Sequence, residues 1–257
     1  MAFANQVVII TGASSGIGWA LAKEFSRQGA KVGLLARRAD KLQHLVDEIR
    51  TAGGIAESAV ADVTQRQSLR DAIHALEAKL GPCDVMIANA GVGSTNTLDD
   101  LNISGAEVVI NVNLLGVLYA IEAVLPGMRT RKRGHIAALS SLASYKGLPS
   151  AAAYSASKAA VNAYMESLRI QHYGIGVHFT TICPGFIRTP MIVENKGMFL
   201  ILEADVAARK MIRAIERRKK VFDFPWITSR LTKLSYWMPD WFLRRVMPEQ
   251  VGGAEGK

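Results

Sequence analysis

Tyr154 and Lys158 are four residues apart in the segment Tyr-Ser-Ala-Ser-Lys, and Ser141 lies thirteen residues before the tyrosine. Residues four apart share one face of a helix, so a phenol and an ammonium group at this spacing can point into the same space. A cation beside a phenol favours the phenolate and lowers the tyrosine pKa from its reference value of about 10. The pair therefore predicts a general acid/base that works near neutral pH, although the spacing alone is common and often only structural.

A glycine-rich turn near the N-terminus is a second feature that points to chemistry. It reads Thr-Gly-Ala-Ser-Ser-Gly-Ile-Gly over residues 11–18, follows an apolar β-branched run and precedes an amphipathic helical pattern. This order predicts a phosphate site, because the free N–H groups at a helix N-terminus attract an anion. Gly12 permits the tight turn, Gly16 lets a pyrophosphate approach the backbone, and Gly18 lets the helix pack on the strand.

The elements that must position these residues follow from hydrophobic periodicity. Strand-like runs lie near residues 7–11, 31–36, 55–60, 83–88, 134–140, 176–182 and 220–224, and helical patterns span 16–28, 38–52, 65–80, 98–128 and 153–173. More than one helix, or a break at Gly105, is expected within 98–128. The alternation predicts an α/β fold with a doubly wound, Rossmann-like parallel sheet of about seven strands and helices on both faces. Ligands bind at the carboxyl ends of such strands, where the motifs fall.

Together these motifs resemble the short-chain dehydrogenase/reductase family, in its short single-domain branch. The resemblance runs from Gln6 to Thr189 and rests on the glycine loop, Asp62-Val63, Asn89-Ala90-Gly91, Asn113, Ser141, Tyr154, Lys158 and Pro184-Gly185, in family order. It implies hydride transfer between a nicotinamide and a carbonyl or carbinol carbon. A nucleotide-sugar epimerase or dehydratase would use the same Tyr/Lys pair, but in a longer chain with an extra substrate domain.

The resemblance implies a role for each matching residue. Tyr154 exchanges the proton with the substrate oxygen, Ser141 positions that oxygen, and Lys158 also holds the nicotinamide ribose. Asn113 supports a water-linked proton path from the lysine, or is only a capping or kink-filling amide. The implied cofactor-binding residues are Gly12, Ser14, Ser15, Gly16, Ile17, Gly18, Arg37, Arg38, Asp62, Val63, Asn89, Ala90, Gly91, Tyr154, Lys158, Pro184, Gly185, Ile187 and Thr189.

The end of the second predicted strand favours NADP(H) over NAD(H). An NAD-selective site usually places Asp or Glu there, whereas this chain has Ala36 followed by Arg37 and Arg38. A guanidinium group suits a 2′-phosphate, and the resemblance assigns that contact to Arg37, with a hydroxyl from Ser15. The alternative is that both arginines are the solvated start of a basic helix face.

The segment 186–203 is expected to form a substrate lid. It contains Met191, Ile192, Val193, Met198, Phe199, Leu200 and Ile201. An apolar lid with methionines suits a lipophilic or aromatic substrate better than a sugar, although core or oligomer packing would need the same residue types.

Net charge and aromatic residues are concentrated toward the carboxyl end. The chain of 257 residues carries a net charge of +9, and residues 207–245 hold eleven Lys/Arg against three Asp/Glu. We expect one dinucleotide-binding and catalytic domain over 1–224 and a basic aromatic extension over 225–257. Peripheral contact of 225–247 with an anionic membrane is one hypothesis. Packing at the pocket mouth or a subunit interface competes with it, and nucleic-acid binding is disfavoured because no recognition module is visible.

The remaining composition excludes several other classes. Two distant cysteines in apolar runs predict reduced core residues, and the five scattered histidines predict no metal site. The N-terminus has no signal-peptide pattern, and no apolar run reaches about 18 residues, so a cytoplasmic protein without a spanning helix is expected. The function predicted is an NADP(H)-dependent alcohol dehydrogenase or carbonyl reductase, and the family resemblance implies a homodimer or homotetramer. The alternative is a catalytically idle NADP(H)-binding module that contacts a partner or a membrane through its carboxyl-terminal segment.

Overall fold

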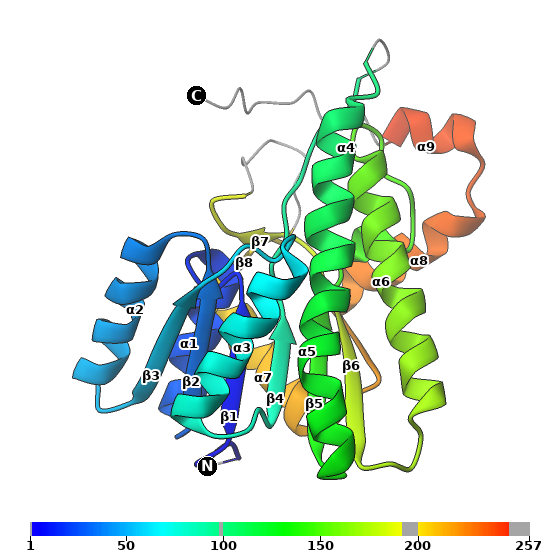
Figure 1. Cartoon of the computed structure of the whole chain (residues 1–257). Coiled ribbons are helices and arrows are strands. Elements are labelled where there is room, and N and C mark those ends of the chain that lie inside the picture. Colours follow the sequence, from blue (N-terminus) through cyan, green and yellow to red (C-terminus); the bar gives the residue numbers. More distant parts are fainter. Residues whose placement is uncertain (1, 98–99, 192–199, 247–257) are drawn as a thin grey trace.

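Seven parallel strands form the central sheet of the computed structural model, which describes residues 2–97, 100–191 and 200–246 (Figure 1). The order is β3-β2-β1-β4-β5-β6-β9. Strands β2 and β3 are added on one side of β1 and the later strands on the other, so the switch point of the sheet lies between β1 and β4. This confirms the predicted doubly wound, Rossmann-like α/β fold. The strands are β1 (Val7–Thr11), β2 (Lys31–Ala36), β3 (Ile55–Val60), β4 (Val85–Ala88), β5 (Gly134–Leu139), β6 (Val177–Pro184) and β9 (Val221–Phe224).

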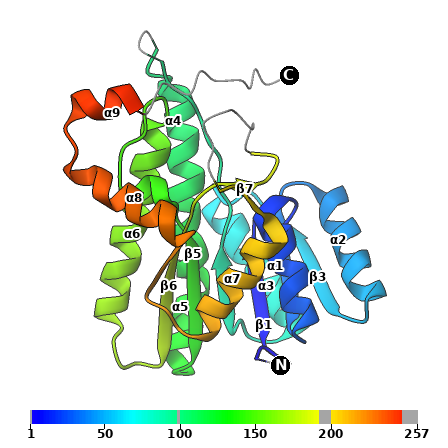
Figure 2. The same ribbon diagram turned by 180° about the vertical axis from the view of Figure 1, so that it is seen from behind.

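Helices cover both faces of the sheet, as Figures 1 and 2 show from opposite sides. One face carries α1 (Gly16–Arg27), α2 (Ala39–Thr51) and α7 (Ala204–Glu216). The other carries α3 (Arg66–Leu80), α4 (Ile103–Ile110), α5 (Gly116–Thr130) and α6 (Ala152–Gln171). Strand β1, between these layers, is apolar on both sides: Val8 and Ile10 enter one hydrophobic core, and Val7 and Ile9 enter the other. Side chains alternate across a strand, so a continuous apolar run is what a doubly covered sheet requires.

The segment predicted to hold more than one helix, or a break at Gly105, contains α4 and α5, which a π-helical turn joins into one uninterrupted helical run. It runs from Ile103 to Thr130 over 28 residues, and Asn102 caps it by accepting from the Gly105 N–H at 3.0 Å. The irregularity lies further on, in the π-helical turn η1 (Asn111–Leu115). The predicted break at Gly105 is therefore wrong, because the Asn102 cap lets the helix start just before this glycine and pass through it.

This long helix also bears on the expectation that the chain has no membrane-spanning helix. By length and composition it is apolar enough to cross a membrane, and half of its most apolar stretch is buried inside the fold. An apolar core helix covering a sheet meets the same criteria. Cys83 and Cys183 are both buried and unpaired, which confirms their prediction as core thiols.

The carboxyl-terminal third contains two short strands and several short helices that lie outside the seven-stranded sheet. Two short strands, β7 (Ile187–Arg188) and β8 (Leu202–Glu203), pair in parallel, so they bring the two ends of the predicted lid together. Ile192, Val193, Met198 and Phe199 of that lid lie outside the described residues. After β9 come α8 (Trp226–Leu234), the 3-10 turn η3 (Ser235–Trp237) and α9 (Asp240–Val246). Pro225 and Pro239 directly precede the first residues of α8 and α9.

Candidate active site

A cavity of about 400 Å³ lies at the carboxyl ends of the central strands. All the residues predicted for the site line it, except Gly18 and Asn113. Eight lining residues were absent from the predicted set: Ala36, Ala61, Val92, Val112, Leu139, Ser140, Pro190 and Met191. Four of them, Ala36, Ala61, Val92 and Leu139, are apolar residues at or after the ends of β2, β3, β4 and β5, so strand-end position rather than residue type was the signal for them.

The glycine loop between β1 and α1 makes a close backbone cradle. Gly12 has φ +68°, and a Cβ there would lie 2.8 Å from the Ala90 Cα atom. A Cβ on Gly18 would lie 2.4 Å from the Gly12 carbonyl oxygen, so Gly18 fixes the packing of α1 against the loop without reaching the cavity. The start of α1 at Gly16 opens onto the cavity and presents its first N–H groups there. This donor set and this close approach fit a dinucleotide pyrophosphate.

Ser141, Tyr154 and Lys158 meet at one wall of the cavity. Ser141 caps the 3-10 turn η2 (Leu142–Ser144), where its hydroxyl accepts from the Ala143 N–H at 3.1 Å, and it also hydrogen-bonds the Tyr154 phenol. One turn along α6, the Lys158 Nζ donates to the Leu139 carbonyl oxygen at 2.8 Å and lies 5.7 Å from the centre of the Tyr154 ring. Ser140 points elsewhere, because its hydroxyl donates to the Lys158 carbonyl oxygen at 2.9 Å. Of these two neighbouring serines, Ser141 is therefore the one beside Tyr154.

The electrostatics of this wall differ from the expectation of an acidified tyrosine. Burial raises the pKa of Tyr154 above its ordinary value, and the hydrogen bond with Ser141 offsets only part of that rise. Burial also lowers the pKa of Lys158 to about 8. The lysine is thus a buried amine that titrates near neutral pH, and the prediction that it lowers the tyrosine pKa is wrong for this structure.

Asn113 lies beneath the cavity in the π-helical turn, where it is fully buried. Its Nδ2 group donates to the Val92 carbonyl oxygen at 2.9 Å and to the Ser157 hydroxyl at 3.2 Å, and its Oδ1 atom accepts from the Val92 N–H at 2.8 Å. A carboxamide has two donor and two acceptor positions, so one acceptor position on Oδ1 is left, on the side of Gly91. The amide therefore joins the loop after β4 to helix α6.

The two arginines after β2 have different surroundings. The Arg38 guanidinium donates to the Ser14 hydroxyl from Nε at 3.1 Å and from Nη2 at 2.8 Å, and to the Ser15 hydroxyl at 2.8 Å. The Arg37 side chain is 71 % exposed and lies 3.7 Å from Asp62 Oδ2. Burial alone would raise the pKa of Asp62, but hydrogen bonds from Thr64 and the nearby Arg37 outweigh it and hold that pKa below its usual value. Arg38 is thus the arginine that contacts the glycine loop.

Asn89 connects the two strand ends at the switch point. Its Nδ2 group donates to the Thr11 carbonyl oxygen at 2.8 Å, and the Thr11 hydroxyl accepts from the backbone N–H groups of Asn89 and Ala90 at 3.0 and 3.1 Å. The side chain therefore fixes the turn after β4, and the residues of this turn, Asn89, Ala90 and Gly91, line the cavity.

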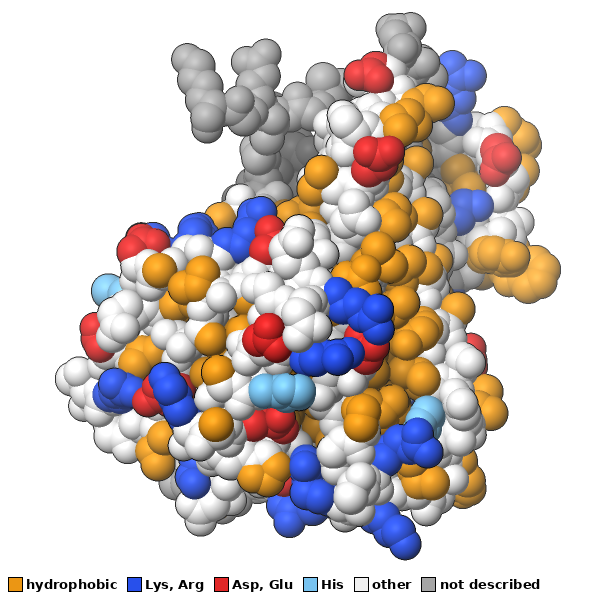
Figure 3. All heavy atoms as spheres, in the orientation of Figure 1, with side chains coloured by type: hydrophobic (Ala, Val, Ile, Leu, Met, Phe, Trp, Pro, Cys, Tyr) orange, Lys and Arg blue, Asp and Glu red, His pale blue; other side chains and the backbone are white. Residues whose placement is uncertain are grey.

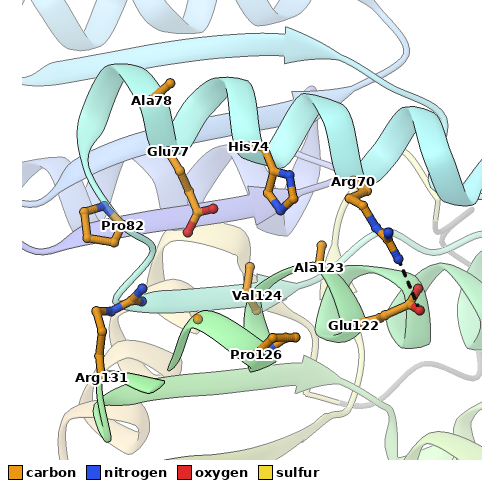
Figure 4. Close-up of a pocket in the computed structure, with 11 residues that line it drawn as sticks. Arg70, His74, Glu77, Ala78, Pro82, Glu122, Ala123, Val124, Pro126 and Arg131 are labelled. Atoms are coloured by element: carbon orange, nitrogen blue, oxygen red, sulfur yellow. Dashed lines mark ion pairs between the residues drawn. The ribbon is translucent and has the colours of Figure 1, made fainter. Parts of the chain in front are cut away.

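A second, wider hollow of about 710 Å³ lies on the surface between α3 and α5 (Figure 4). Figure 4 shows Arg70, His74 and Glu77 on α3 facing Glu122 and Arg131 on the other side, with an ion pair between Arg70 and Glu122 at 3.3 Å. Glu122 also pairs with Arg66. The Glu122 carboxylate in this hollow is therefore held by two arginines. Ser141, Tyr154 and Lys158, the residues predicted to act on a substrate, line the smaller, strand-end cavity, so we assign the chemistry to that cavity.

Comparisons with known proteins agree with this arrangement. A family model described as short chain dehydrogenase matches residues 6–215. A Myxococcus xanthus (strain DK1622) protein described as an uncharacterized oxidoreductase is 39 % identical over 236 residues, which cover 91 % of this chain and 93 % of that protein. The chain therefore belongs to the short-chain dehydrogenase/reductase family and is an oxidoreductase of that family, whose members use NAD(P)(H).

Two crystal structures share the fold. Levodione reductase superposes with a TM-score of 0.82 at 23 % identity, covering 89 % of this chain and 99 % of that one, which at this identity shows the fold alone. A single-residue variant of actinorhodin polyketide ketoreductase, solved with NADPH, superposes with a TM-score of 0.79 at 26 % identity, covering 85 % of this chain and 95 % of that one.

Proposed function

We propose that this protein is an NADP(H)-dependent alcohol dehydrogenase or carbonyl reductase that acts on a lipophilic carbonyl or secondary alcohol. The observation that carries the proposal is the contact between Ser141 and Tyr154 one helical turn from Lys158, on the wall of the cavity that the glycine loop also lines. A protein that only binds a dinucleotide has no need of a hydrogen-bonded acid/base at that wall.

Tyr154 acts as the proton donor and acceptor at the substrate oxygen. When bound, the nicotinamide supplies or accepts the hydride. In reduction the Tyr154 hydroxyl donates its proton to the carbonyl oxygen, and in oxidation the phenolate removes it again. Because burial raises the pKa of Tyr154, the phenol is protonated at neutral pH, which suits the reductive direction. Ser141 donates a hydrogen bond to the same oxygen and so fixes its distance from the phenol.

Lys158 restores the proton that Tyr154 loses. Its amine titrates near pH 8 and lies one helical turn from the phenol, so it can hold a proton at neutral pH and release it at modest cost. Asn113 supports this path through the acceptor position left on its Oδ1 atom. This atom and the Lys158 Nζ both lie close to Gly91, since a Cβ added to that glycine would be 3.6 Å from the Nζ. A water that donates to Oδ1 would continue the path.

The choice of NADP(H) rests on Arg38, Ser14 and Ser15. These three side chains form one hydrogen-bonded group at the rim of the cavity, and Ala36 leaves the end of β2 without a carboxylate. A guanidinium group and two hydroxyls are donors for a 2′-phosphate, whereas the ribose of NAD(H) would lack its usual acceptor. Asp62 and Val63 would lie against the adenine, and Thr189 would bond the nicotinamide carboxamide.

Apolar side chains at the cavity rim beyond Thr189 support a lipophilic substrate. Met191 lines the cavity and is exposed, and Leu200 is exposed where the chain returns to β8. Apolar side chains at a rim favour an apolar ligand, since its binding removes their surface from water.

The test is NADPH oxidation measured against carbonyl compounds ordered by hydrophobicity, with NADH and Tyr154→Phe as controls. We expect turnover with NADPH that increases with apolar substrates and falls about 10²- to 10⁴-fold in Tyr154→Phe, while NADPH still quenches protein fluorescence. Tight NADPH binding without turnover on any carbonyl would favour the idle binding module. A preference for NADH would overturn the role given to Arg38.

A further inference from the structure

The segment after β9 exposes large apolar side chains instead of burying them. On α8, η3 and α9 these are Trp226, Ile227, Leu231, Leu234, Tyr236, Trp237 and Trp241, and Trp237 is 82 % exposed. Apolar side chains gather along the edge formed by α8 and α9 in the space-filling view (Figure 3). Single exposed apolar residues are normal, but a continuous group of this size marks a surface that meets a partner.

The exposed residues of α8 share one face of that helix. Trp226, Ile227, Leu231 and Leu234 follow the spacing i, i+1, i+5, i+8, and Arg230 falls within the same face at i+4. The opposite side carries the buried Ser229. A core helix buries its apolar face, whereas α8 turns its apolar face to solvent, and the Arg230 cation lies within that face.

This apolar face is presented by a helix that is held to the body of the protein. Asp223, the residue before Phe224 at the end of β9, forms an ion pair with Lys233 and accepts from Tyr145 at 2.8 Å and from Ser229 at 3.4 Å. The Lys233 Nζ lies 4.5 Å from the centre of the Tyr145 ring. Leu243 of α9 is buried as well. The aromatic side chains thus project from a fixed surface, which lowers the entropic cost of binding.

The charges around this face are almost all positive. Residues 225–245 contain Arg230, Lys233, Arg244 and Arg245 against one carboxylate, Asp240, and three cations are left when Lys233 is counted with its partner Asp223. A symmetric contact between two copies through this face would bring like charges together, which is unfavourable. A bilayer with anionic headgroups over an apolar interior matches both the tryptophans and the cations. Trp and Tyr favour the membrane–water interface, and Lys and Arg favour anionic lipid.

We propose that α8, η3 and α9 form a membrane-contact surface, through which the protein attaches peripherally to a bilayer containing anionic lipid. The surface is joined to the cavity rim, because the Gly185 N–H, in the turn that lines the cavity, donates to the Phe224 carbonyl oxygen at 2.7 Å, directly before Pro225 and α8. Attachment therefore places the cavity rim close to the bilayer. It does not depend on which reaction the cavity performs.

The test is co-sedimentation of the full chain with vesicles of phosphatidylcholine alone and of phosphatidylcholine with phosphatidylglycerol, at low and high salt. We expect sedimentation with the anionic vesicles at low salt, a several-fold smaller bound fraction at high salt or without phosphatidylglycerol, and a blue shift of tryptophan fluorescence on binding. Trp237→Ser combined with Trp241→Ser, and separately Arg244→Glu combined with Arg245→Glu, should each lower the bound fraction at least about fivefold.

Matched controls separate this surface from apolar area and charge in general. Tyr173→Ser removes an aromatic side chain that is 87 % exposed at the far end of α6, and Arg129→Glu reverses an exposed charge near the end of α5; both should bind like the wild type. Equal recovery in the supernatant with and without anionic lipid would overturn the proposal. So would a mass in solution that falls in the tryptophan variant, which would assign the surface to a second copy, or retention on an oligonucleotide without binding to vesicles.

Discussion

Lys158 is a buried cation whose burial opposes its charged form. The side chain is almost fully buried, and that burial lowers its pKa to about 8, while its Nζ has the Leu139 carbonyl oxygen as acceptor. A lysine that holds a proton inside the fold at neutral pH lowers the free energy of unfolding, and a functional site retains it for its chemistry.

The cost of Lys158 predicts a pH-dependent stability difference. The unfolded chain keeps this lysine protonated to a higher pH than the folded chain does, so the free energy of unfolding rises with pH through this window, from about 8 to about 10.5. Lys158→Met should therefore be more stable than the wild type by up to about 3 kcal/mol at pH 7, and the difference should shrink by about 2 kcal/mol at pH 9.5. Urea unfolding at both pH values measures it. A pH-independent difference would contradict the assignment of the lowered pKa to Lys158.

Arg37 and Arg38 make a second prediction at the residue scale. Arg38 donates three hydrogen bonds to the Ser14 and Ser15 hydroxyls, whereas Arg37 is largely exposed beside Asp62. Arg38→Ala should raise the Kd for NADPH about 10- to 100-fold, since hydrogen bonds to a charged phosphate are lost, and should leave the Kd for NADH nearly unchanged. Fluorescence titration measures both. Arg37→Ala is the matched control, and a larger effect from Arg37 would restore the role that the sequence first assigned to it.

At the scale of elements, the glycine loop and the π-helical turn hold the site from opposite sides. The loop brings α1 against the end of β1, and the turn buries Asn113 between the loop after β4 and α6. The loop depends on close contacts between backbone atoms, and the turn depends on a buried amide with three of its four hydrogen-bonding positions occupied, so each tolerates little change.

Gly18 tests the close packing of α1 on its loop. A Cβ at this position meets the Gly12 carbonyl oxygen at 2.4 Å, and backbone cannot move aside cheaply. Gly18→Ala should lower the free energy of unfolding by about 1–3 kcal/mol and weaken NADPH binding, because the loop must shift. Chemical denaturation and fluorescence titration measure the two effects. Gly93→Ala is the control: a Cβ on this exposed glycine meets nothing within 4 Å, and it should change neither quantity.

At the scale of the whole molecule, a band of apolar side chains runs along the face formed by α4, α5 and α6 (Figure 3). Ile103 and Val108 of α4 are exposed there, and Tyr119, Leu125 and Tyr164 are only partly buried. A band of this kind is typical of an interface between subunits, and we infer that copies of the chain pair through these helices.

Pairing of copies through these helices would give a mass in solution two or four times the chain mass of 27.9 kDa. Val108→Glu should reduce that mass toward the monomer, because a carboxylate at a 54 % exposed position would become buried without a partner. Light scattering after size-exclusion chromatography measures it. Val60→Glu changes a residue of similar exposure, 58 %, on the edge strand β3 and should leave the mass unchanged. A monomeric wild type would refute the inferred interface.

The elements α7, β7 and β8 were not predicted. Periodicity and motif spacing predicted the seven strands of the main sheet, the helices before β6, the glycine loop and the Ser141/Tyr154/Lys158 spacing. These depend on residues close together in the chain, through periodicity, turn chemistry and helical spacing, so they are readable before folding. Tertiary structure alone decided that Arg38 rather than Arg37 contacts the loop serines, that burial raises the pKa of Tyr154, and that the apolar face of α8 points to solvent. Each of these depends on groups far apart in sequence, or on exclusion of water, which exist only once the chain has packed.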